Sequence, residues 1–324
     1  MRQWNSSLPR LRLGTLLRSF FIALSTNRSF RAFSERSSLG RRVSRRFVAG
    51  TSLDEALEAA AALNAEGIDV TLDSLGESVL EIAQAEKSAA VYHQLLDAIQ
   101  ARGLRANVSV KLTQVGMDIG GPTAGPALAE RIVGEMVAHA AANRNFVRID
   151  MEGSEYTEPT LALTERLHRQ YPGAVGTVLQ AYLFRTEQDA ERLLSQGIRI
   201  RLCKGAYKEP AEIAFPAKSD VDANYIKLMK RLVSSPVFCG IASHDEAILE
   251  KLCAFVATQK IDKRAFEFQM LYGIRRDLQR KLVQQGYGVR VYVPFGAEWY
   301  PYFMRRLAER PANVLFLARN FLRR

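Results

Sequence analysis

The 324-residue sequence has few of the residues that build disulfide frameworks and metal centres. Its three cysteines (Cys203, Cys239 and Cys253) form no CxxC pair, and its four histidines are scattered along the chain. An odd number of isolated cysteines is typical of a protein from a reducing compartment and argues against a disulfide-bonded scaffold. The scattered histidines indicate no metal centre, so we expect none.

Several functional motifs are missing as well. No apolar run approaches the roughly 20 residues that a transmembrane helix needs. No Ser-His-Asp arrangement, P-loop or zinc-ligand spacing occurs, which argues against the usual hydrolases and kinases. No GxGxxG sequence follows the first predicted strand, so an open, doubly wound sheet remains only as the alternative α/β architecture.

Acidic residues are nearly absent from residues 1–46, which we call the N-terminal arm. The arm contains eleven arginines, no lysine and a single acid, Glu35, and therefore has a balance of +10. The other 278 residues carry 34 basic and 33 acidic side chains, so the arm supplies almost all of the net charge of +11.

Within the arm, residues 11–24 place leucine and phenylalanine at helical spacing. A basic amphipathic helix of this kind can lie on an anionic membrane surface. Alternatively, the helix packs on the rest of the chain, or the Arg- and Ser-rich arm is a mitochondrial transit peptide. Nucleic-acid binding is not expected, because no recognised motif accompanies the basic residues.

Beyond the arm, short apolar segments alternate with segments of helical periodicity. Ser52 and Glu55 form a predicted capping box for a first helix, which ends near Gly67. Eight such strand–helix units in one chain predict an α/β fold, a (βα)8 barrel over residues 47–324. The predicted strands are 68–72, 108–112, 146–151, 174–181, 198–204, 237–243, 266–271 and 289–293.

Polar side chains fall at the end of nearly every predicted strand. In a barrel these strand ends converge on one mouth, where active sites are built. Because unpartnered polar groups are costly in apolar strands, the pattern predicts a functional site. The residues are Asp73, Lys111, Asp150, Gln180, Arg201, Lys204, His244, Asp245, Glu267, Gln269 and Tyr292.

Individual strand ends suggest particular chemistry. Lys111 would be largely desolvated, so it needs a carboxylate, and we expect Asp150 on the next strand to supply it. Such a lysine could also form a Schiff base. Arg201 and Lys204, followed by Gly205, suit a phosphate or a polarised heterocycle.

The two strand ends that follow carry further polar groups. His244 is expected to donate a hydrogen bond to a ligand or to the backbone. Glu267 and Gln269 share one strand face because side chains alternate along a strand.

Near the C-terminus, Tyr302, Arg305, Arg306 and Glu309 recur at helical spacing on a helix that should begin near Trp299. Guanidinium groups bind carboxylates bidentately, so adjacent arginines suit a small carboxylate ligand. The alternative is a solvated helix with an internal ion pair.

Taken together, these segments resemble proline dehydrogenase, a flavin-dependent enzyme of proline catabolism. The matching segments, which extend from about Phe47 to the C-terminus, are VSVKLTQ, RIDMEG, VLQAYL, RLCKGAY, ASHD, FEFQMLYG, and VYVPFG followed by YFMRRLAERPAN. The resemblance is to the monofunctional bacterial type. It implies a distorted (βα)8 barrel with extra N-terminal helices and a C-terminal helix over the barrel mouth, with FAD bound at that mouth.

The resemblance also implies the reaction and its partners. L-Proline would be oxidised to Δ1-pyrroline-5-carboxylate, with a hydride passing from proline C5 to FAD N5 and the electrons then to a membrane quinone. A separate pyrroline-5-carboxylate dehydrogenase would act downstream. The protein would be cytoplasmic, with reversible, peripheral contact to the inner face of the membrane.

Residue roles follow from the matching positions. The implied catalytic residues are Asp150, Arg201, Lys111 and Glu309, the last holding the arginine pair that binds the proline carboxylate. Implied substrate contacts are Lys111, Leu271, Tyr292, Tyr302, Arg305 and Arg306. Implied cofactor contacts are Met151, Gln180, Arg201, Cys203, Lys204, Gly205, Ala206, Tyr207, Ser243, His244, Glu267 and Gln269.

Two other functions remain open on the residues alone. One is a Schiff-base lyase that uses Lys111 or Lys204 on a carboxylate- or phosphate-bearing substrate. The other is a catalytically inactive binding module that the arm directs to its target.

Overall fold

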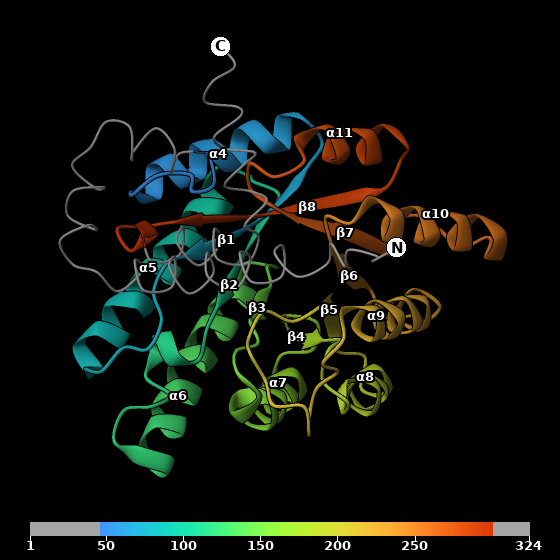
Figure 1. The fold of residues 1–324 in the computed structure, drawn as a ribbon. Coiled ribbons are helices and arrows are strands. Elements are labelled where there is room, and N and C mark those ends of the chain that lie inside the picture. Colours follow the sequence, from blue (N-terminus) through green and yellow to red (C-terminus); the bar gives the residue numbers. More distant parts are fainter. Residues whose placement is uncertain (1–45, 301–324) are drawn as a thin grey trace, which may run out of the picture.

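The computed structural model describes residues 46–300, and its strands close into a parallel barrel (Figure 1). Neighbouring strands pair in sequence order, and the last strand pairs with the first. This confirms the predicted barrel. The strands are β1 (Asp69–Ser74), β2 (Ala106–Val110), β3 (Val147–Ile149), β4 (Val175–Gln180), β5 (Arg199–Cys203), β6 (Cys239–Ala242), β7 (Phe266–Leu271) and β8 (Gly288–Phe295).

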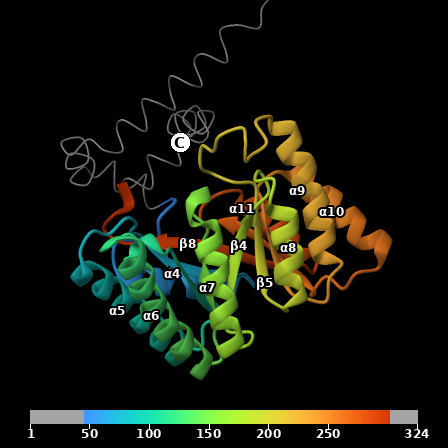
Figure 2. The ribbon, with the colours of Figure 1, turned by 90° about the horizontal axis from the view of Figure 1, so that it is seen from below.

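A helix follows each of the first seven strands and packs on the outside of the barrel. Figure 2 shows α7, α8 and α9 beside β4 and β5, the strands that they contact. Two short 3-10 helices, η1 (Thr113–Val115) and η2 (Ser154–Tyr156), lie in the loops after β2 and β3. The helices are α5 (Ile82–Ala101), α6 (Gly121–Ala142), α7 (Thr157–Gln170), α8 (Thr186–Ser195), α9 (Lys218–Val233), α10 (Glu246–Gln259) and α11 (Arg276–Gln284).

Helix α4 (Leu53–Ala65) precedes the first strand and covers the place where β8 pairs with β1 to close the barrel. The predicted capping box is present: the backbone N–H of Glu55 donates to Ser52 Oγ, and the Glu55 carboxylate accepts from the Ser52 N–H. Gly67, with a φ of 80°, follows the C-cap. The helix packs against both β1 and β8. A regular barrel places there the helix that follows its eighth strand.

Apolar and polar side chains alternate along the strands. One set belongs to the core shared with the surrounding helices and includes Val70, Leu72, Val108, Val110, Val147, Ile149, Ile200, Leu202, Phe268, Val289 and Val291. The alternate set is also buried but polar, and it includes Thr71, Asp73, Asn107, Ser109, Arg148, Arg201, Glu267 and Gln269. Because side chains alternate in direction along a strand, this second set lies inside the barrel. A buried polar interior must satisfy its hydrogen bonds internally.

Two strand glycines make room for these large interior side chains. A Cβ at Gly176 would lie 2.3 Å from the carbonyl oxygen of Arg199 and 3.0 Å from Nη1 of Arg148. At Gly240, a Cβ would lie 2.3 Å from the amide nitrogen of Gln269. A side chain at either position would displace the interior arginine or glutamine.

Some predicted features fall outside the described residues. These are the arm up to residue 45, its amphipathic helix, the extra N-terminal helices and the C-terminal helix beyond Tyr300. Trp299 and Tyr300 are helical, at the position where the C-terminal helix was predicted to begin. Among residues 46–300, no helix combines the length and the apolar character that crossing a membrane requires.

Candidate active site

Asp150, directly after β3, is held by donors from three other strands. Its Oδ1 accepts hydrogen bonds from Arg201 Nη1 at 2.7 Å and from Ser109 Oγ at 2.6 Å. Its Oδ2 accepts from the Tyr292 hydroxyl at 2.7 Å. The carboxylate therefore ties β3 to β2, β5 and β8 toward the carboxyl ends of the strands.

Charge neighbours keep this carboxylate ionised. Burial raises the pKa of Asp150, but the positive charges of Arg201 and Lys111 outweigh burial and hold the pKa below its usual value. Burial and the negative charges of Asp150 and Asp73 raise the pKa of Tyr292 well above its usual value. Tyr292 therefore stays protonated and donates to a charged acceptor, a combination that gives strong hydrogen bonds.

Lys111 pairs with Asp73 rather than with Asp150, which corrects the expected pairing. Its Nζ lies 3.2 and 3.4 Å from the two oxygens of Asp73 on β1. Both Asp150 oxygens already accept from Arg201, Ser109 and Tyr292, which explains the different partner. Asp150 still acts on Lys111 through its charge.

The Lys111–Asp73 pair is nearly removed from solvent. The Asp73 side chain is 1% exposed and that of Lys111 17% exposed. Burial favours the neutral lysine, but the charges of Asp73 and Asp150 prevail and raise the pKa of Lys111. Burial raises the pKa of Asp73, while Lys111 opposes that shift. Lys111 is therefore a cation at neutral pH.

A chain of polar contacts leads from Arg201 toward the amino end of the barrel. Arg201 Nε donates to Gln269, whose amide donates to Glu267 at 2.6 Å. Arg290 Nε in turn donates to Glu267 at 2.7 Å. Glu267 was predicted at a strand end, but it is the second residue of β7 and faces Arg290. It shares a strand face with Gln269 but lies two residues nearer the amino end, so it does not reach the mouth.

The loop after β5 carries the predicted phosphate-binding segment. Lys204 Nζ pairs with Asp222 on α9 and, at 3.3 Å, with Asp245. Gly205 has a φ of 117°, and a Cβ there would lie 2.4 Å from the Tyr182 ring, so both the backbone and the space require glycine. Ala206 and Tyr207 follow it and are exposed.

Three further predicted residues are held in place by backbone contacts. Nε2 of His244 accepts from the backbone N–H of Leu271 at 2.8 Å, so the predicted donor role of His244 falls to its other ring nitrogen, Nδ1. The Ser243 hydroxyl accepts from the backbone N–H of Asp245 at 3.1 Å. Gln180, at the end of β4, donates to the carbonyl oxygen of Glu152 at 2.9 Å.

Some of the remaining predicted residues lie within residues 46–300, and the others lie outside them. Met151 is buried directly after Asp150, while Cys203 and Leu271 end β5 and β7 and are half-buried. Tyr302, Arg305, Arg306 and Glu309 lie outside the described residues.

Sequence reasoning missed Ser109 and gave Asp73 no role. Ser109 stands two positions before Lys111 in the segment Val-Ser-Val-Lys, so both side chains point to the same side of β2. That spacing is the signal that could have identified Ser109. Asp73 stood among the polar strand ends, but the sequence did not distinguish it from Asp150 as the partner of Lys111.

Charged side chains buried at the carboxyl ends of barrel strands define the class of protein, a (βα)8-barrel enzyme. A family model described as proline dehydrogenase matches residues 56–319. The proline dehydrogenase of Deinococcus radiodurans is 42% identical over 281 residues, which cover 86% of this chain and 89% of that protein.

Two more similarities extend this finding. Proline dehydrogenase 1 of Bacillus subtilis is 36% identical over 310 residues, covering 95% of this chain and 100% of that protein. The crystal structure of proline utilization A from Bdellovibrio bacteriovorus, inactivated by N-propargylglycine, has the same fold, with a TM-score of 0.78 at 23% identity. It covers 90% of this chain and 36% of that one. The chain belongs to the proline dehydrogenase family, and it is an oxidoreductase of that family.

The Lys111–Asp73 pair generates a stability prediction. Replacing Lys111 by methionine leaves Asp73 buried without its cation, and we expect a loss of about 3–5 kcal/mol in the free energy of unfolding. In the double variant K111M/D73N both charges are gone, so most of this loss should be recovered. Urea denaturation at pH 7 of the wild type, K111M, D73N and the double variant measures the coupling. A double variant whose loss equals the sum of the single losses contradicts the pairing.

The free energy of unfolding of the same variants should depend on pH in a defined way. Burial raises the pKa of Asp73 above the usual range, and removing Lys111 raises it further. A carboxyl with a raised pKa in the folded state binds a proton more tightly there than when unfolded, so lowering the pH stabilises the fold. The stability gap between K111M and K111M/D73N should therefore narrow as the pH falls from 7 toward 5. A gap that stays constant contradicts this assignment.

Proposed function

We propose that the protein catalyses FAD-dependent oxidation of L-proline to Δ1-pyrroline-5-carboxylate at the carboxyl ends of its strands. The observation that carries the proposal is the buried charge cluster of Asp73, Lys111, Asp150, Arg201 and Tyr292, in a chain matched by the proline dehydrogenase family over residues 56–319. Family membership supports proline as the substrate, and the cluster supplies charged groups at the mouth where barrel enzymes act.

The residues at the mouth fit a flavin dinucleotide by their donor chemistry. Arg201 and Lys204 provide cations, and Gln180, Gln269 and Ser243 provide amide and hydroxyl groups. Phosphates and ring carbonyls accept hydrogen bonds from such groups. Gly205, which lies beside the Tyr182 ring, has no side chain, so a ligand can approach its backbone closely. We assign these residues, with Met151, Cys203, Ala206, Tyr207 and His244, to cofactor binding; Glu267 would act through Gln269.

The proposed roles of the protein groups are binding and orientation. When bound, FAD would supply the two-electron redox chemistry that the oxidation of proline requires. Arg305 and Arg306 bind the proline carboxylate, and Glu309 holds the two arginines. Leu271, Tyr292 and Tyr302 enclose the proline ring. Fixing the substrate in this way reduces the entropy cost of reaching the reactive geometry.

Asp150 and Arg201 act as a preorganised electrostatic unit. The Arg201 guanidinium is fixed by Asp150 at 2.7 Å and by Gln269, and its carbon lies 5.2 Å from the centre of the Tyr292 ring. A cation held in a buried site need not reorient when charge shifts during the reaction. Lys111, held by Asp73, adds a second fixed cation on the substrate side.

The charge state of Lys111 disfavours the Schiff-base lyase alternative. An amine attacks a carbonyl only when it is unprotonated, so Schiff-base lysines have lowered pKa values. The charges of Asp73 and Asp150 raise the pKa of Lys111 instead. Lys204 pairs with two carboxylates, Asp222 and Asp245.

Anaerobic absorbance spectroscopy tests the proposed reaction. We expect the purified protein to show flavin bands at about 380 and 450 nm, which bleach on addition of L-proline because the cofactor is reduced. D-Proline serves as the matched control and should bleach the bands far more slowly. Bands that persist with L-proline exclude it as the reductant. A protein that remains colourless after incubation with FAD, yet is trapped on a substrate by borohydride, supports the lyase instead.

The electron acceptor and the cell location form a second part of the proposal. We assign the acceptor as a membrane quinone and place the protein in the cytoplasm, with reversible contact to the inner membrane face. The eleven arginines of residues 1–46 support this assignment, because basic segments are attracted to anionic lipid surfaces. The product would pass to a separate pyrroline-5-carboxylate dehydrogenase.

Deletion of residues 1–40 tests the membrane contact. The deletion removes seven of the eleven arginines of the arm. Vesicle binding should weaken because each basic residue near an anionic surface contributes about 1 kcal/mol. Co-sedimentation with phosphatidylserine vesicles measures the change, and neutral phosphatidylcholine vesicles are the control. Equal binding by the full and shortened chains rules out the arm as the membrane contact.

A further inference from the structure

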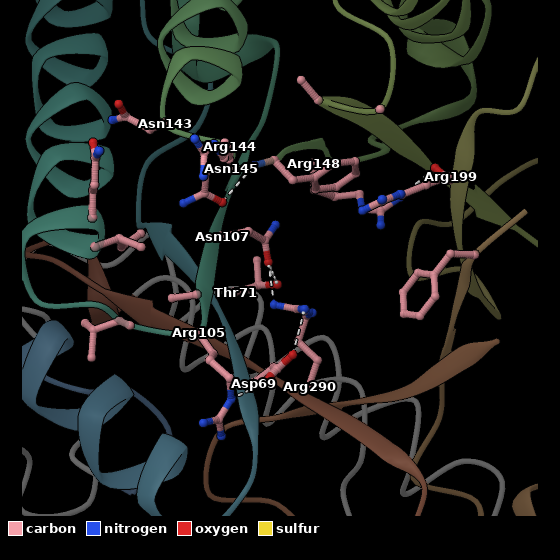
Figure 3. A pocket seen from close by; sticks show the side chains of 18 of the residues that line it. Asp69, Thr71, Arg105, Asn107, Asn143, Arg144, Asn145, Arg148, Arg199 and Arg290 are labelled. Atoms are coloured by element: carbon pink, nitrogen blue, oxygen red, sulfur yellow. Dashed lines mark hydrogen bonds and ion pairs between the residues drawn. The ribbon is translucent and has the colours of Figure 1, made fainter. Parts of the chain in front are cut away.

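A cavity of about 670 Å³ opens at the amino ends of the strands, opposite the candidate active site. Figure 3 shows side chains that line it. Its walls come from the first residues of several strands and from the loops that precede them. Asp69 begins β1, Arg199 begins β5, and Arg290 is the third residue of β8. The proposed function uses none of these three residues; Glu267 and Gln269, which also line the cavity, are the residues shared with the proposed cofactor site.

Arginine dominates the charge of this cavity. Five arginines line it, Arg105, Arg144, Arg148, Arg199 and Arg290, against two acids, Asp69 and Glu267. The lining therefore carries three positive charges in excess. Residues 47–324 carry 34 basic and 33 acidic side chains, so this excess is a local concentration and does not reflect a basic barrel.

The two acids are already paired. Asp69 forms ion pairs with Arg105 at 2.9 Å and with Arg290 at 3.3 Å. Glu267 forms an ion pair with Arg290 at 2.7 Å. Within residues 46–300, Arg144, Arg148 and Arg199 form no ion pair with a carboxylate. Three cations in one cavity thus lack a negative partner in the described part of the chain.

Arg148 is one of these arginines without a carboxylate partner, and its side chain lies inside the barrel. Its side chain is buried, at 4% exposure, and Nη1 donates to the carbonyl oxygens of Thr177 and Arg199 at 2.8 Å. Its Nε is buried with no acceptor among the described residues. Burial and the nearby charge of Arg201 lower the pKa of Arg148 to about 9. A buried cation without an anion is destabilising unless a ligand supplies one.

Two more features of the lining suit an anion. The amide nitrogen of Asn143, which lines the same cavity, is a second buried donor left without an acceptor by the described residues. The Phe146 ring holds two guanidinium groups in place, with its centre 4.7 Å from the Arg148 carbon and 5.4 Å from that of Arg199. Groups oriented before binding lose less entropy when a ligand arrives.

We propose that this cavity binds a multiply charged small anion, a phosphate ester or a polycarboxylate. Guanidinium groups bind both kinds of oxyanion bidentately. A single carboxylate would leave two of the three excess charges unbalanced, so the ligand carries at least two negative charges. The cavity volume lies within the range of about 300–1,000 Å³ that is usual for small-molecule sites.

Calorimetric titration of the purified full-length protein with inorganic pyrophosphate, and separately with citrate, tests the proposal at constant ionic strength. We compare the wild type with R199Q and with R144N; the asparagine tolerates the φ of 52° at position 144. Both positions are exposed, so these variants should fold. We expect saturable binding at one site, weakened about tenfold or more by each substitution. The tighter probe identifies the ligand as phosphate-bearing or polycarboxylate.

Two control variants locate the site. R264Q removes one positive charge before β7, at the same end of the barrel, from a side chain that is 87% exposed and lies outside the cavity lining. K204Q removes one at the opposite end of the barrel, from a residue that we assign to cofactor binding. Both should retain wild-type affinity for the probe.

Three results overturn the proposal. These are the absence of saturation by either probe, equal weakening in R264Q, and loss of binding in K204Q but not in R199Q. Phenylglyoxal labelling followed by mass spectrometry gives an independent measurement, in which the bound probe should protect Arg199 and Arg144. Neither experiment uses proline or turnover, so its outcome is separate from that of the flavin bleaching experiment.

Discussion

Asp150 accepts hydrogen bonds from Ser109, Arg201 and Tyr292. This buried, ionised carboxylate is the constraint on which the structure of the barrel at the carboxyl ends of its strands depends. Each donor comes from a different strand, so the contact fixes the relative positions of four strands at the site. The cost of burying the charge is offset only while all partners remain in place. Lys111 and Asp73 add a second buried pair beside it. The need to satisfy these charges thus positions the same groups that we assign to the reaction.

The two ends of the barrel balance their charges differently. At the carboxyl ends, two buried carboxylates face two cations, and the groups satisfy each other. At the amino ends, five arginines face two acids. A polar chain from Arg290 through Glu267 and Gln269 to Arg201 connects the two ends. The barrel therefore has a balanced charge cluster at one end and a cationic excess at the other, and the two ends suit different ligands.

The sequence predicted the barrel because apolar alternation and turn residues are local signals. All eight strands overlap their predicted positions, and the Ser52–Glu55 capping box has the predicted geometry. Pairings across the barrel depend on side-chain reach and could not be predicted in this way. Asp150 and Asp73 are equally plausible partners for Lys111 from spacing alone, and Glu267 differs from Gln269 only by its depth along β7. The cavity was missed because its five arginines come from four separate segments, and each arginine taken alone resembles an ordinary surface residue.

The replacement D150N tests the central claim that the Asp150 charge organises the site. Asparagine keeps the size of the side chain but removes its charge, so Arg201 loses its ionic partner. We expect the variant to fold and to retain flavin but to be less stable, because Arg201 stays buried without its ionic partner. The rate of anaerobic flavin reduction by L-proline should fall by about 100-fold or more, the scale of losing one preorganised electrostatic group. Stopped-flow absorbance at about 450 nm, where an oxidised flavin absorbs, measures this rate. A flavin-loaded D150N protein that is reduced at the wild-type rate contradicts the central role of Asp150.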